Sequence, residues 1–481
     1  MAGIGIQLNK IFNKNTLITS FYGIGFSIVY TIMPMLVVIF TLLAMYKVLG
    51  FQTISYTERQ LFSSSILYIF IFSLLVFSLF TTVISKYQAD KIFLEHYEDI
   101  RPSIYVGTVL ILTCASCIAI PFYCYAILIG NISPYYVFTS YMAFLGMTLT
   151  FSSMLHNLTL KQYKQLSIYF FIGMTIAFLL SVLFRFVLDI SLTYSMLLSL
   201  SIGFFIIAAL GISNVLRFFP DNSHRYKEVF AYFRKYWRQM LSNFFYTLGL
   251  FIHNFIFWTK PWNLVVYSTY VSNETYDMAS FLAMFTNVTA TVLFITRLEM
   301  QFKDKYKNYN EAVLGGKLKT IKNYEGRMFD GLASQIFTLA SLQFIISVIL
   351  FFIAILLFPR MGFSGLIMDI YPLLIIAYYI SILFYSELIF LYYFEDSKGA
   401  VMSGMLFVVI TFLATLWTSN WNPIWYGLGF VIGALSAFTF AFFRLRWISN
   451  NYHTLVFCRD DILKNVYQEI PSALVYNRNQ L

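Results

Sequence analysis

The fold is decided by residues 102–160, which read PSIYVGTVLILTCASCIAIPFYCYAILIGNISPYYVFTSYMAFLGMTLTFSSMLHNLTL. This stretch contains no Asp, Glu, Lys or Arg, and its only break is the turn-forming Asn131-Ile132-Ser133-Pro134. About 20 apolar residues cross the hydrocarbon of a bilayer as a helix, and a helix satisfies its own backbone hydrogen bonds, which an open strand cannot do. The stretch therefore predicts two membrane-spanning helices joined by a turn.

Uncharged stretches of similar length recur along the whole chain. Hydrophobic residues make up 59% and charged residues 11% of the sequence, whereas charged residues are about a quarter of a soluble domain. We therefore predict an all-α polytopic membrane protein with about twelve spans. They lie near residues 18–46, 60–85, 103–129, 135–157, 165–188, 192–216, 239–258, 278–298, 331–358, 370–394, 399–418 and 423–443.

The basic residues predict the orientation. All but five of the 32 Lys and Arg residues fall before the first span, after the last, or in alternate gaps between spans. The exceptions are Lys47, Arg59, Arg185, Lys260 and Arg360. Because basic residues accumulate on the cytoplasmic side, we expect a multi-pass protein of the cytoplasmic (inner) membrane with both termini in the cytoplasm. All seven tryptophans fall at or near predicted span ends, as expected of amphipathic rings at headgroup level.

The net charge of +10 then mainly reflects basic residues that orient the chain in the membrane and contact lipid headgroups. The basic residues flank the spans and form no separate basic domain, so no nucleic-acid partner is expected.

Twelve spans divide into six and six. We predict an N-terminal six-helix lobe at 1–219, a cytoplasmic amphipathic linker helix at 220–237, a C-terminal six-helix lobe at 238–446 and a cytoplasmic tail at 447–481. The second lobe contains the largest cytoplasmic loop, 300–330, where two short helices are expected. The linker prediction rests on the three- and four-residue spacing of Tyr226, Val229, Phe230, Phe233 and Trp237.

Several short segments carry a family resemblance. The chain opens with Met1-Ala2-Gly3-Ile4-Gly5 and Gln7-Leu8-Asn9-Lys10. Its middle contains Tyr276-Asp277-Met278-Ala279-Ser280-Phe281-Leu282-Ala283, Thr296-Arg297-Leu298-Glu299 and Tyr309-Asn310-Glu311-Ala312-Val313 with Gly315-Gly316, and later comes Leu391-Tyr392-Tyr393-Phe394-Glu395-Asp396. In this order the segments resemble the family of the Pel exopolysaccharide transporter, PelG. That family is a branch of the multidrug/oligosaccharidyl-lipid/polysaccharide exporter superfamily, which includes the MATE transporters and polysaccharide flippases.

The resemblance implies two lobes around a central passage that carries an N-acetylgalactosamine-rich polymer outward for the biofilm matrix. It also implies a cytoplasmic glycosyltransferase and membrane subunits of the Pel synthase complex as partners. Two departures stand out: Met33 and Met35 flank Pro34 where Gly and Trp are expected, and span seven has His253-Asn254 where an Asp-Lys pair is expected. The family role of a charged pair in span seven is therefore not carried over to this chain.

Polar groups within the spans are the candidates for transport or gating. A charge at the bilayer centre costs roughly 2.5 to 3.5 kcal/mol, so a charge that persists there usually faces protein or a watery cavity. Glu387 in span ten is the deepest acid and the best candidate for a coupling or gating carboxylate; the alternative is a neutral carboxyl bonded to a neighbour. His253 and Asn254 form either a hydrogen-bonded core pair or part of a proton relay.

Five further candidates lie nearer the span ends. Arg185 and Asp189 are four residues apart, which permits an ion pair at the headgroups or in an outer vestibule. Asp277, at the outer start of span eight, and Arg297 and Glu299, at its inner end, are gate groups or simple helix-end groups. Pro34 removes a helical hydrogen bond in span one and can kink that helix, with or without a role in gating.

Tyrosine is frequent in and beside the spans. A tyrosine ring offers a flat face to a sugar and a hydroxyl to its polar edge without a fixed charge. The set as a whole therefore suits a neutral glycan, although lipid-facing or interfacial packing explains any single ring. The set comprises Tyr123, Tyr125, Tyr135, Tyr136, Tyr141, Tyr378, Tyr379 and Tyr385.

Other functions make different demands on the sequence. A lipid-linked oligosaccharide flippase or an ion-coupled small-molecule exporter fits the same topology, and a non-transporting scaffold of a synthase complex fits it as well. An enzyme needs a clustered site, and His96 with Glu95, Glu98 and Asp99 is the only such cluster; a solvated loop explains it. Cys114 and Cys117 lie within a span without His or carboxylate neighbours, so no metal is expected there. No phosphate loop with Lys-Ser/Thr occurs, and neither catalysis nor a cofactor is predicted.

Overall fold

The computed structural model describes residues 17–160, 162–287, 299–360, 362–363 and 365–452. In these ranges the chain is almost entirely helical and contains one two-stranded sheet. The helices are α2 (Leu17–Val48), α3 (Tyr56–Phe93), α4 (Ile100–Leu128), α5 (Pro134–Thr159), α6 (Tyr163–Phe186), α7 (Leu192–Phe218), α8 (Tyr226–Lys235), α9 (Trp237–Gly249), α10 (Ile252–Trp258), α11 (Glu274–Met284), α13 (Glu299–Gly315), α14 (Leu318–Leu357), α15 (Gly365–Tyr393), α16 (Ser397–Thr418) and α17 (Leu428–Asn450). The strands are β1 (Leu264–Val266) and β2 (Tyr270–Ser272), and short 3-10 turns lie at Phe51–Thr53 (η1), Tyr97–Asp99 (η2) and Pro423–Trp425 (η4).

The all-α polytopic fold is confirmed, and the count of twelve spans stays a prediction. Within the described residues, eight helices are long and apolar enough to cross a membrane, or nine if α9 and α10 form one bent span. Helix α5 has 26 residues but carries many Tyr, Ser and Thr side chains, and it is not among the eight. For α2, only Met33–Val48 can be assessed, and this part is a shorter apolar helix.

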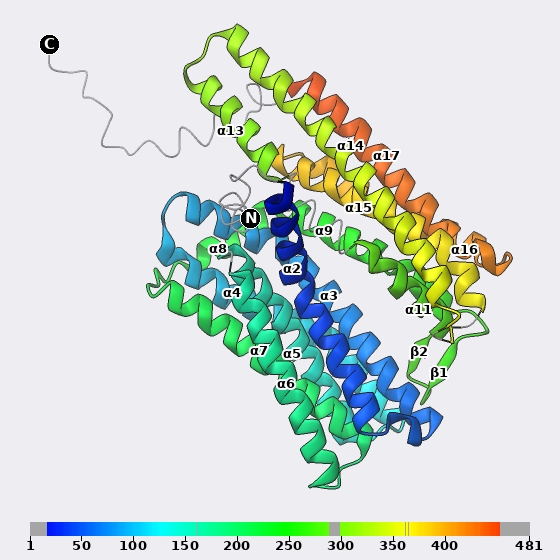
Figure 1. Cartoon of the computed structure of the whole chain (residues 1–481). Coiled ribbons are helices and arrows are strands. Elements are labelled where there is room, and N and C mark those ends of the chain that lie inside the picture. The colour runs from blue at the N-terminus through cyan, green and yellow to red at the C-terminus, as the bar shows by residue number, and fades with distance from the viewer. Residues whose placement is uncertain (1–16, 161, 288–298, 361, 364, 453–481) are drawn as a thin grey trace.

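The helices form two groups (Figure 1). Helices α2 to α7 share one hydrophobic core, which includes Ile111 and Met196, and we call this group the N-lobe. Helices α9 to α17 surround a second core, which includes Leu374 and Phe384, and we call this group the C-lobe. We call inner the faces that carry the basic gaps, predicted to be cytoplasmic, and outer the opposite faces.

Close helix packing in the C-lobe depends on small residues. Side chains at Gly429 and Gly433 of α17 would collide with Thr415 and Thr411 of α16. Small residues let membrane helices approach closely, and van der Waals contact then holds them together because lipid offers little hydrophobic driving force. The α16–α17 pair is accordingly among the most extensive helix contacts of the C-lobe.

The predicted amphipathic linker is observed as α8. Val229 is buried and contacts Tyr87 and Val106 of the N-lobe, whereas Phe230 is about half exposed. The ring of Tyr232 lies edge-on to that of Tyr87, with 4.8 Å between centroids. The linker therefore packs on the inner end of the N-lobe and leads directly into α9.

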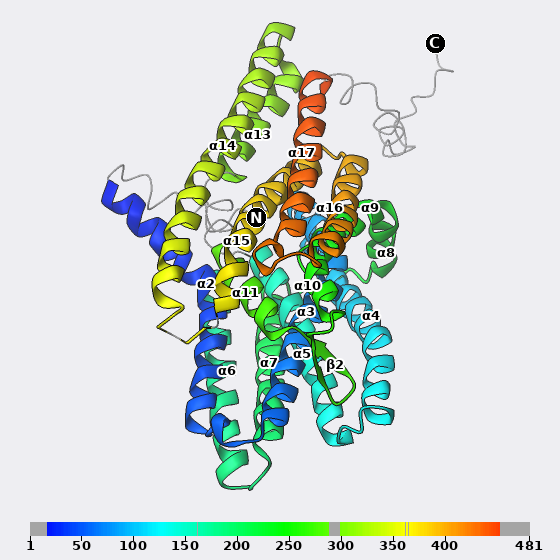
Figure 2. The same ribbon diagram turned by 90° about the vertical axis from the view of Figure 1, so that its right-hand side faces the viewer.

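One prediction about helix boundaries was wrong. The second short helix expected in loop 300–330 is the start of α14, which runs for 40 residues without a break, because no proline interrupts it. Helix α13 and the first part of α14 consequently extend beyond the other C-lobe helices (Figures 1 and 2). The range predicted for span seven is occupied by α9 and α10, which meet at an angle of 46°. The break follows Gly249, where any side chain would overlap the ring of Phe407.

The outer connection between α10 and α11 folds as a β-hairpin that the sequence analysis did not predict. Strands β1 and β2 pair antiparallel, with Leu264 opposite Ser272 and Val266 opposite Tyr270. The turn places both Tyr267 and Ser268 at positive φ, 50° and 51°. Asn-Gly or Asp-Gly is the usual sequence motif of such a turn. Neither occurs here, so no turn motif predicts the hairpin.

Candidate transport site

A buried polar network in the outer half of the C-lobe centres on Asp277. Its carboxylate accepts hydrogen bonds from Asn254 Nδ2 at 2.7 Å, from Trp258 Nε1 at 2.9 Å and from the backbone N–H of Asn273 at 3.0 Å. The side chain of Asn273 caps α11 by accepting from Tyr276 N–H at 3.0 Å. Asp277 thus ties the outer end of α10 to the start of α11 and to the end of β2.

The network continues inward through neutral side chains. Tyr276 Oη lies 2.9 Å from His253 Nδ1, and the histidine ring stacks on Phe430 with 4.2 Å between centroids. Ser280 Oγ donates to Asn254 Oδ1 at 3.3 Å and lies 2.8 Å from Tyr378 Oη. His253 and Asn254 are thus buried and hydrogen-bonded to different partners, and both the core pair and the proton relay stay predictions.

The chemistry of the network favours an anchor over an ion site. Every group that contacts the Asp277 carboxylate is an N–H donor, and donors of this kind stabilise the charged form without a cation. Trp258 lies at a span end, as its position in the sequence predicted, but it is buried and bonds Asp277 instead of facing headgroups.

Glu387 is a second buried acid within the helices of the C-lobe, in addition to Asp396 at the start of α16. It lies in α15, its residue is 0% exposed, and neither carboxylate oxygen has a hydrogen-bond partner among the described residues. A carboxylate with no donor is costly in such a place, unlike Asp277. Of the predicted site residues, Glu387 is therefore the one whose surroundings do not account for its presence.

Arg185, Asp189 and Pro34 lie apart from this network. Arg185 donates to the carbonyl of Ile190 at 3.2 Å, and Asp189 is exposed in the following turn, so the possible ion pair between Arg185 and Asp189 is not formed. Pro34 is buried within α2 of the N-lobe. Glu299 begins α13, and Arg297 lies outside the described residues.

Most of the predicted tyrosines that are buried join helices within a lobe. Tyr123 bonds Ser140 at 3.1 Å, Tyr136 bonds Ser65 at 3.1 Å, and Tyr378 bonds Ser280. Tyr125 and Tyr135 are exposed at the outer end of the N-lobe. The buried rings therefore serve the packing of each lobe, and the exposed ones remain candidates for glycan contact.

On the inner side, the lobes meet through an ion pair. Lys86 Nζ of α3 lies 3.0 Å from Glu395 Oε1, which follows α15, and it also lies 4.5 Å from the ring centroid of Tyr236. Deeper in the seam, Asn243 Nδ2 of α9 donates to the carbonyl of Ser78 at 2.7 Å. Glu395 belongs to a segment that carries the family resemblance, but the sequence alone gave no partner for it.

On the outer side, the lobes meet through an aromatic contact. The ring of Tyr68 in α3 stacks on Trp258 with 5.0 Å between centroids and 8° between planes. Its hydroxyl donates to the carbonyl of Val271 at 2.8 Å and accepts from the N–H of the same residue at 3.0 Å. At the rim, Gln60 Nε2 lies 3.4 Å from Glu274 Oε2.

The two contacts differ in strength. The side chains of Lys86 and Glu395 are 21% and 62% exposed, and ion pairs as accessible as this contribute about 0 to 1 kcal/mol. A stacked aromatic pair contributes about 0.5 to 1.5 kcal/mol beyond its burial, and each of the two partly buried Tyr68 hydrogen bonds adds about 0.5 to 1.5 kcal/mol. The outer contact is therefore the stronger of the two.

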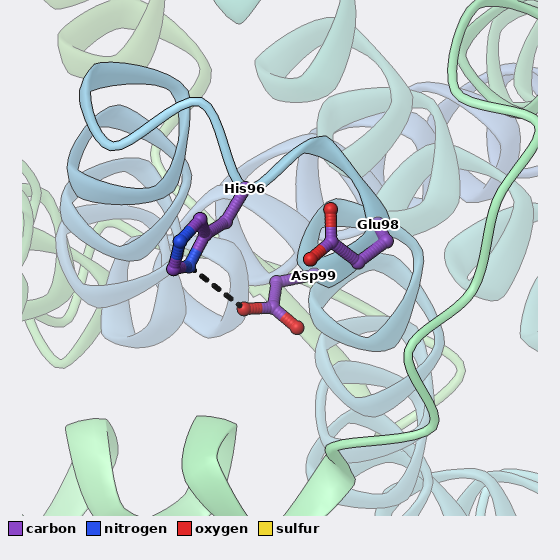
Figure 3. Close-up of side chains that lie close together, drawn as sticks. All are labelled: His96, Glu98 and Asp99. Carbon is purple, nitrogen blue, oxygen red and sulfur yellow. Dashed lines mark ion pairs between the residues drawn. The ribbon is translucent and has the colours of Figure 1, made fainter.

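The His96 cluster is an ion-pair hub at the inner end of the N-lobe (Figure 3). His96, Glu98 and Asp99 place possible metal-ligating atoms within 4.8 Å of one another. The buried Asp99 carboxylate, however, already pairs with Lys91 at 2.7 Å and Arg225 at 3.7 Å, and Lys91 also pairs with Glu228 at 2.6 Å. The cluster thereby joins α3 and η2 to the linker α8 and its preceding turn, a structural role that explains these charges without a metal.

Two further segments of the family resemblance have clear structural roles. Asp396 caps α16 at Gly399 N–H and pairs with Arg444 of α17, whose Nη2 lies 3.2 Å from Asp396 Oδ1. Tyr309 of α13 is buried against Tyr452, and burial raises the pKa of its hydroxyl to about 12, so this group stays neutral. The matching segments therefore fix helix ends and inner contacts of the C-lobe.

A profile of the PelG family of exopolysaccharide exporters (EPS-E) matches residues 1–457. The chain belongs to the PelG family. The match covers both lobes and the linker, and it confirms the resemblance noted in the sequence. The comparison with curated proteins gives no match.

Solved structures show the fold that this PelG-family chain shares. An inward-facing multidrug resistance MATE family transporter of the MOP superfamily matches with a TM-score of 0.53 and 13% identity, over 82% of this chain and 92% of that one. An outward-facing MATE family transporter matches with a TM-score of 0.54 and 10% identity, over 88% and 96%. The Vibrio cholerae MATE transporter VcmN in its bent form matches with a TM-score of 0.54 and 11% identity, over 90% and 97%. The scores are nearly equal, so the resemblance identifies a MATE-like transporter fold and no particular state.

Proposed function

We propose that this chain exports a Pel-type exopolysaccharide, an N-acetylgalactosamine-rich polymer, across the cytoplasmic membrane in support of biofilm matrix production. The observation that carries the proposal is the PelG-family match over residues 1–457. The MATE-like transporter fold supports the same conclusion independently of sequence similarity.

The chemistry of the seam between the lobes suits a neutral polymer. Its contacts include those of Tyr68, Trp258 and Asn243 and an exposed ion pair between Lys86 and Glu395. Such groups offer aromatic faces and hydrogen bonds without a strong field that would hold a charged substrate. The polymer would pass between the lobes, with both termini of the chain on the cytoplasmic side.

Glu387 is the proposed coupling or gating carboxylate. Among the described residues the Glu387 carboxyl has no hydrogen-bond partner, and such burial costs free energy in either protonation state. A costly group of this kind is easier to explain if its surroundings change during a transport cycle. Polymerisation by a cytoplasmic glycosyltransferase or an ion gradient would supply the energy. That glycosyltransferase and the membrane subunits of the synthase complex are the proposed partners.

Cells that produce the polymer provide the direct test. Deletion of this chain, with the synthase left intact, should abolish extracellular polymer, and expression of the intact chain should restore it. A flippase for lipid-linked oligosaccharides would instead leave lipid-linked intermediates on the inner leaflet, which extraction and mass spectrometry detect. Unchanged extracellular polymer in the deletion strain would refute export by this chain and favour a scaffold.

A further inference from the structure

The β1–β2 hairpin belongs to the C-lobe by sequence, but the strand residues beside its turn lie in the core of the N-lobe. Val266 and Tyr270 are members of the hydrophobic cluster that otherwise consists of N-lobe residues. Tyr270 is 1% exposed. A loop that merely connected α10 to α11 would have no need to bury a large ring in the other lobe.

The N-lobe provides a formed socket for the Tyr270 ring. Tyr68 and Phe122 meet it edge-on, with centroid distances of 5.1 and 5.5 Å. Beneath it, Tyr136 and Tyr123 bond the hydroxyls of Ser65 and Ser140 and hold these two serines in place. Since α3, α4 and α5 all contribute, the socket is a property of the lobe and not of one helix.

The rim of the socket is fitted to the turn of the hairpin. Gly130, at the outer end of α4, lies so close to the hairpin that a side chain there would overlap Thr269 Oγ1 and approach the carbonyl of Tyr267 to 2.9 Å. Tyr125 Oη reaches the carbonyl of Ser268 at 3.5 Å. The absence of a Cβ at position 130 is thus what allows the hairpin to seat fully.

The base of the hairpin is fixed to the C-lobe. Asn273, which follows β2, is bonded to Asp277, and Asn263, which precedes β1, donates to the carbonyl of Trp258. Lys260 Nζ bonds Asn420 Oδ1 of the α16–α17 connection at 2.9 Å. The hairpin is therefore held at its base by one lobe and at its tip by the other.

From this arrangement we infer that the hairpin, residues 264–272, is the outer gate of the transporter and that Tyr270 is its latch. Rigid-body parting of the lobes at the outer face requires Tyr270 to leave its socket, because the base cannot follow the N-lobe without breaking the Asp277 contacts. No charged side chain of the hairpin enters the socket. The contacts of Tyr68 with Trp258 and Val271 must part together with the Tyr270 ring. The inference rests on the proposed function, since it assigns the exit step of the polymer.

Accessibility of the socket tests the gate without any measurement of export. Ser65 is 0% exposed and lies under the hairpin. In a chain whose native cysteines are replaced by serine, Ser65→Cys should react slowly with a membrane-impermeant maleimide added outside. Addition of Tyr270→Ala should raise that rate at least fivefold, while Tyr267→Ala, which alters an exposed side chain of the same turn, should leave it within twofold. Equal rates in the Ser65→Cys chains with and without Tyr270→Ala would overturn the inference.

A disulfide tests whether the gate must open. A Cβ at position 130 would lie within about 4 Å of the Cβ of Thr269, a separation that a disulfide can bridge. Oxidised Gly130→Cys/Thr269→Cys should lose at least nine-tenths of export and regain it on reduction, which also shows that the double substitution folds. The matched controls are Gly130→Cys alone and Thr269→Cys alone, which cannot form the disulfide and whose export should not change on oxidation.

The two measurements separate the two proposals. Full export with the hairpin cross-linked to the N-lobe would overturn the gate and leave export by this chain intact. Absence of export in every variant, including the unmodified chain, would count against the proposed function, while the Ser65→Cys labelling would still report whether Tyr270 closes the socket.

Discussion

Replacement of Asp277 by asparagine tests the network that holds the broken span and the hairpin together. The substitution keeps the size of the side chain but converts one acceptor oxygen into an NH₂ donor. One oxygen of Asp277 accepts from Asn254 and Trp258, and the other accepts from Trp258 and Asn273. Whichever oxygen is lost, one buried N–H then faces another donor.

The cost follows from these contacts. A buried donor left without an acceptor costs about 1 to 3 kcal/mol, and the hydrogen bonds that remain lose the contribution of the charge, since charge-assisted bonds are roughly twice as strong as neutral ones. We expect Asp277→Asn to lower the free energy of unfolding of the C-lobe by about 2 to 5 kcal/mol. In a body of about 200 residues, each kcal/mol lowers the melting temperature by roughly 2 to 4 °C.

Thermal unfolding of the purified protein in detergent measures this effect. The matched control is Asp369→Asn, an exposed acid in the first part of α15, which should shift the free energy of unfolding by less than about 0.5 kcal/mol. Asp277→Asn should melt roughly 4 °C or more below the control. If both variants melt together, Asp277 does not anchor α10 and α11; if Asp277→Asn melts normally but loses export, it acts in transport directly.

Three further substitutions address the seam, the buried acid and a helix cap. Lys86→Glu and Glu395→Lys should each change export by up to about fivefold, because the exposed pair contributes at most about 1 kcal/mol, and the double swap should restore it; failure of the swap to restore export would contradict an inner contact between these groups. Glu387→Gln should lower export at least tenfold without a change in melting temperature, since no hydrogen bond of the carboxyl is lost; unchanged export would make Glu387 a structural group. Arg444→Gln removes the charged donor to the buried Asp396 carboxylate and should lower the free energy of unfolding by about 1 to 3 kcal/mol, as thermal melting would show. Arg446→Gln, which changes an exposed arginine of the same helix, should have little effect.

The fold class followed from the sequence because its cause is local. An uncharged stretch such as 102–160 must be helical in lipid regardless of its neighbours, and α4 and α5 occupy the predicted ranges. The amphipathic linker was predicted equally well, because periodic spacing fixes one apolar face wherever the helix packs.

The break in span seven and the hairpin were missed because their causes lie in other parts of the chain. Gly249 ends α9 where the ring of Phe407 approaches it, a contact between residues 158 positions apart that no local pattern records. The hairpin turn uses Tyr267 and Ser268 at positive φ, and docking of Tyr270 in the N-lobe holds it in place of the usual turn residues.

The candidate site was predicted in part. Polarity within a span singled out His253, Asn254, Asp277 and Glu387, because buried polar groups are rare in spans whatever their role. Their partners could not be predicted. The position of Trp258 at a span end indicated a ring at headgroup level, and the position of Lys86 in a basic gap indicated only the orientation of the chain in the membrane. Tertiary contact alone distinguishes the Asp277 anchor from Glu387, which has no hydrogen-bond partner in the part of the chain that the structure describes.

Export into reconstituted vesicles tests the central claim most directly. The vesicles contain the synthase, its sugar donor and this chain. Glycan that resists nuclease and protease should accumulate on the side of the membrane opposite to the active site of the synthase. Vesicles with the synthase alone, or with the chain locked by Gly130→Cys/Thr269→Cys, should keep the polymer on the side of synthesis. Equal translocation in the presence and absence of this chain would contradict the account.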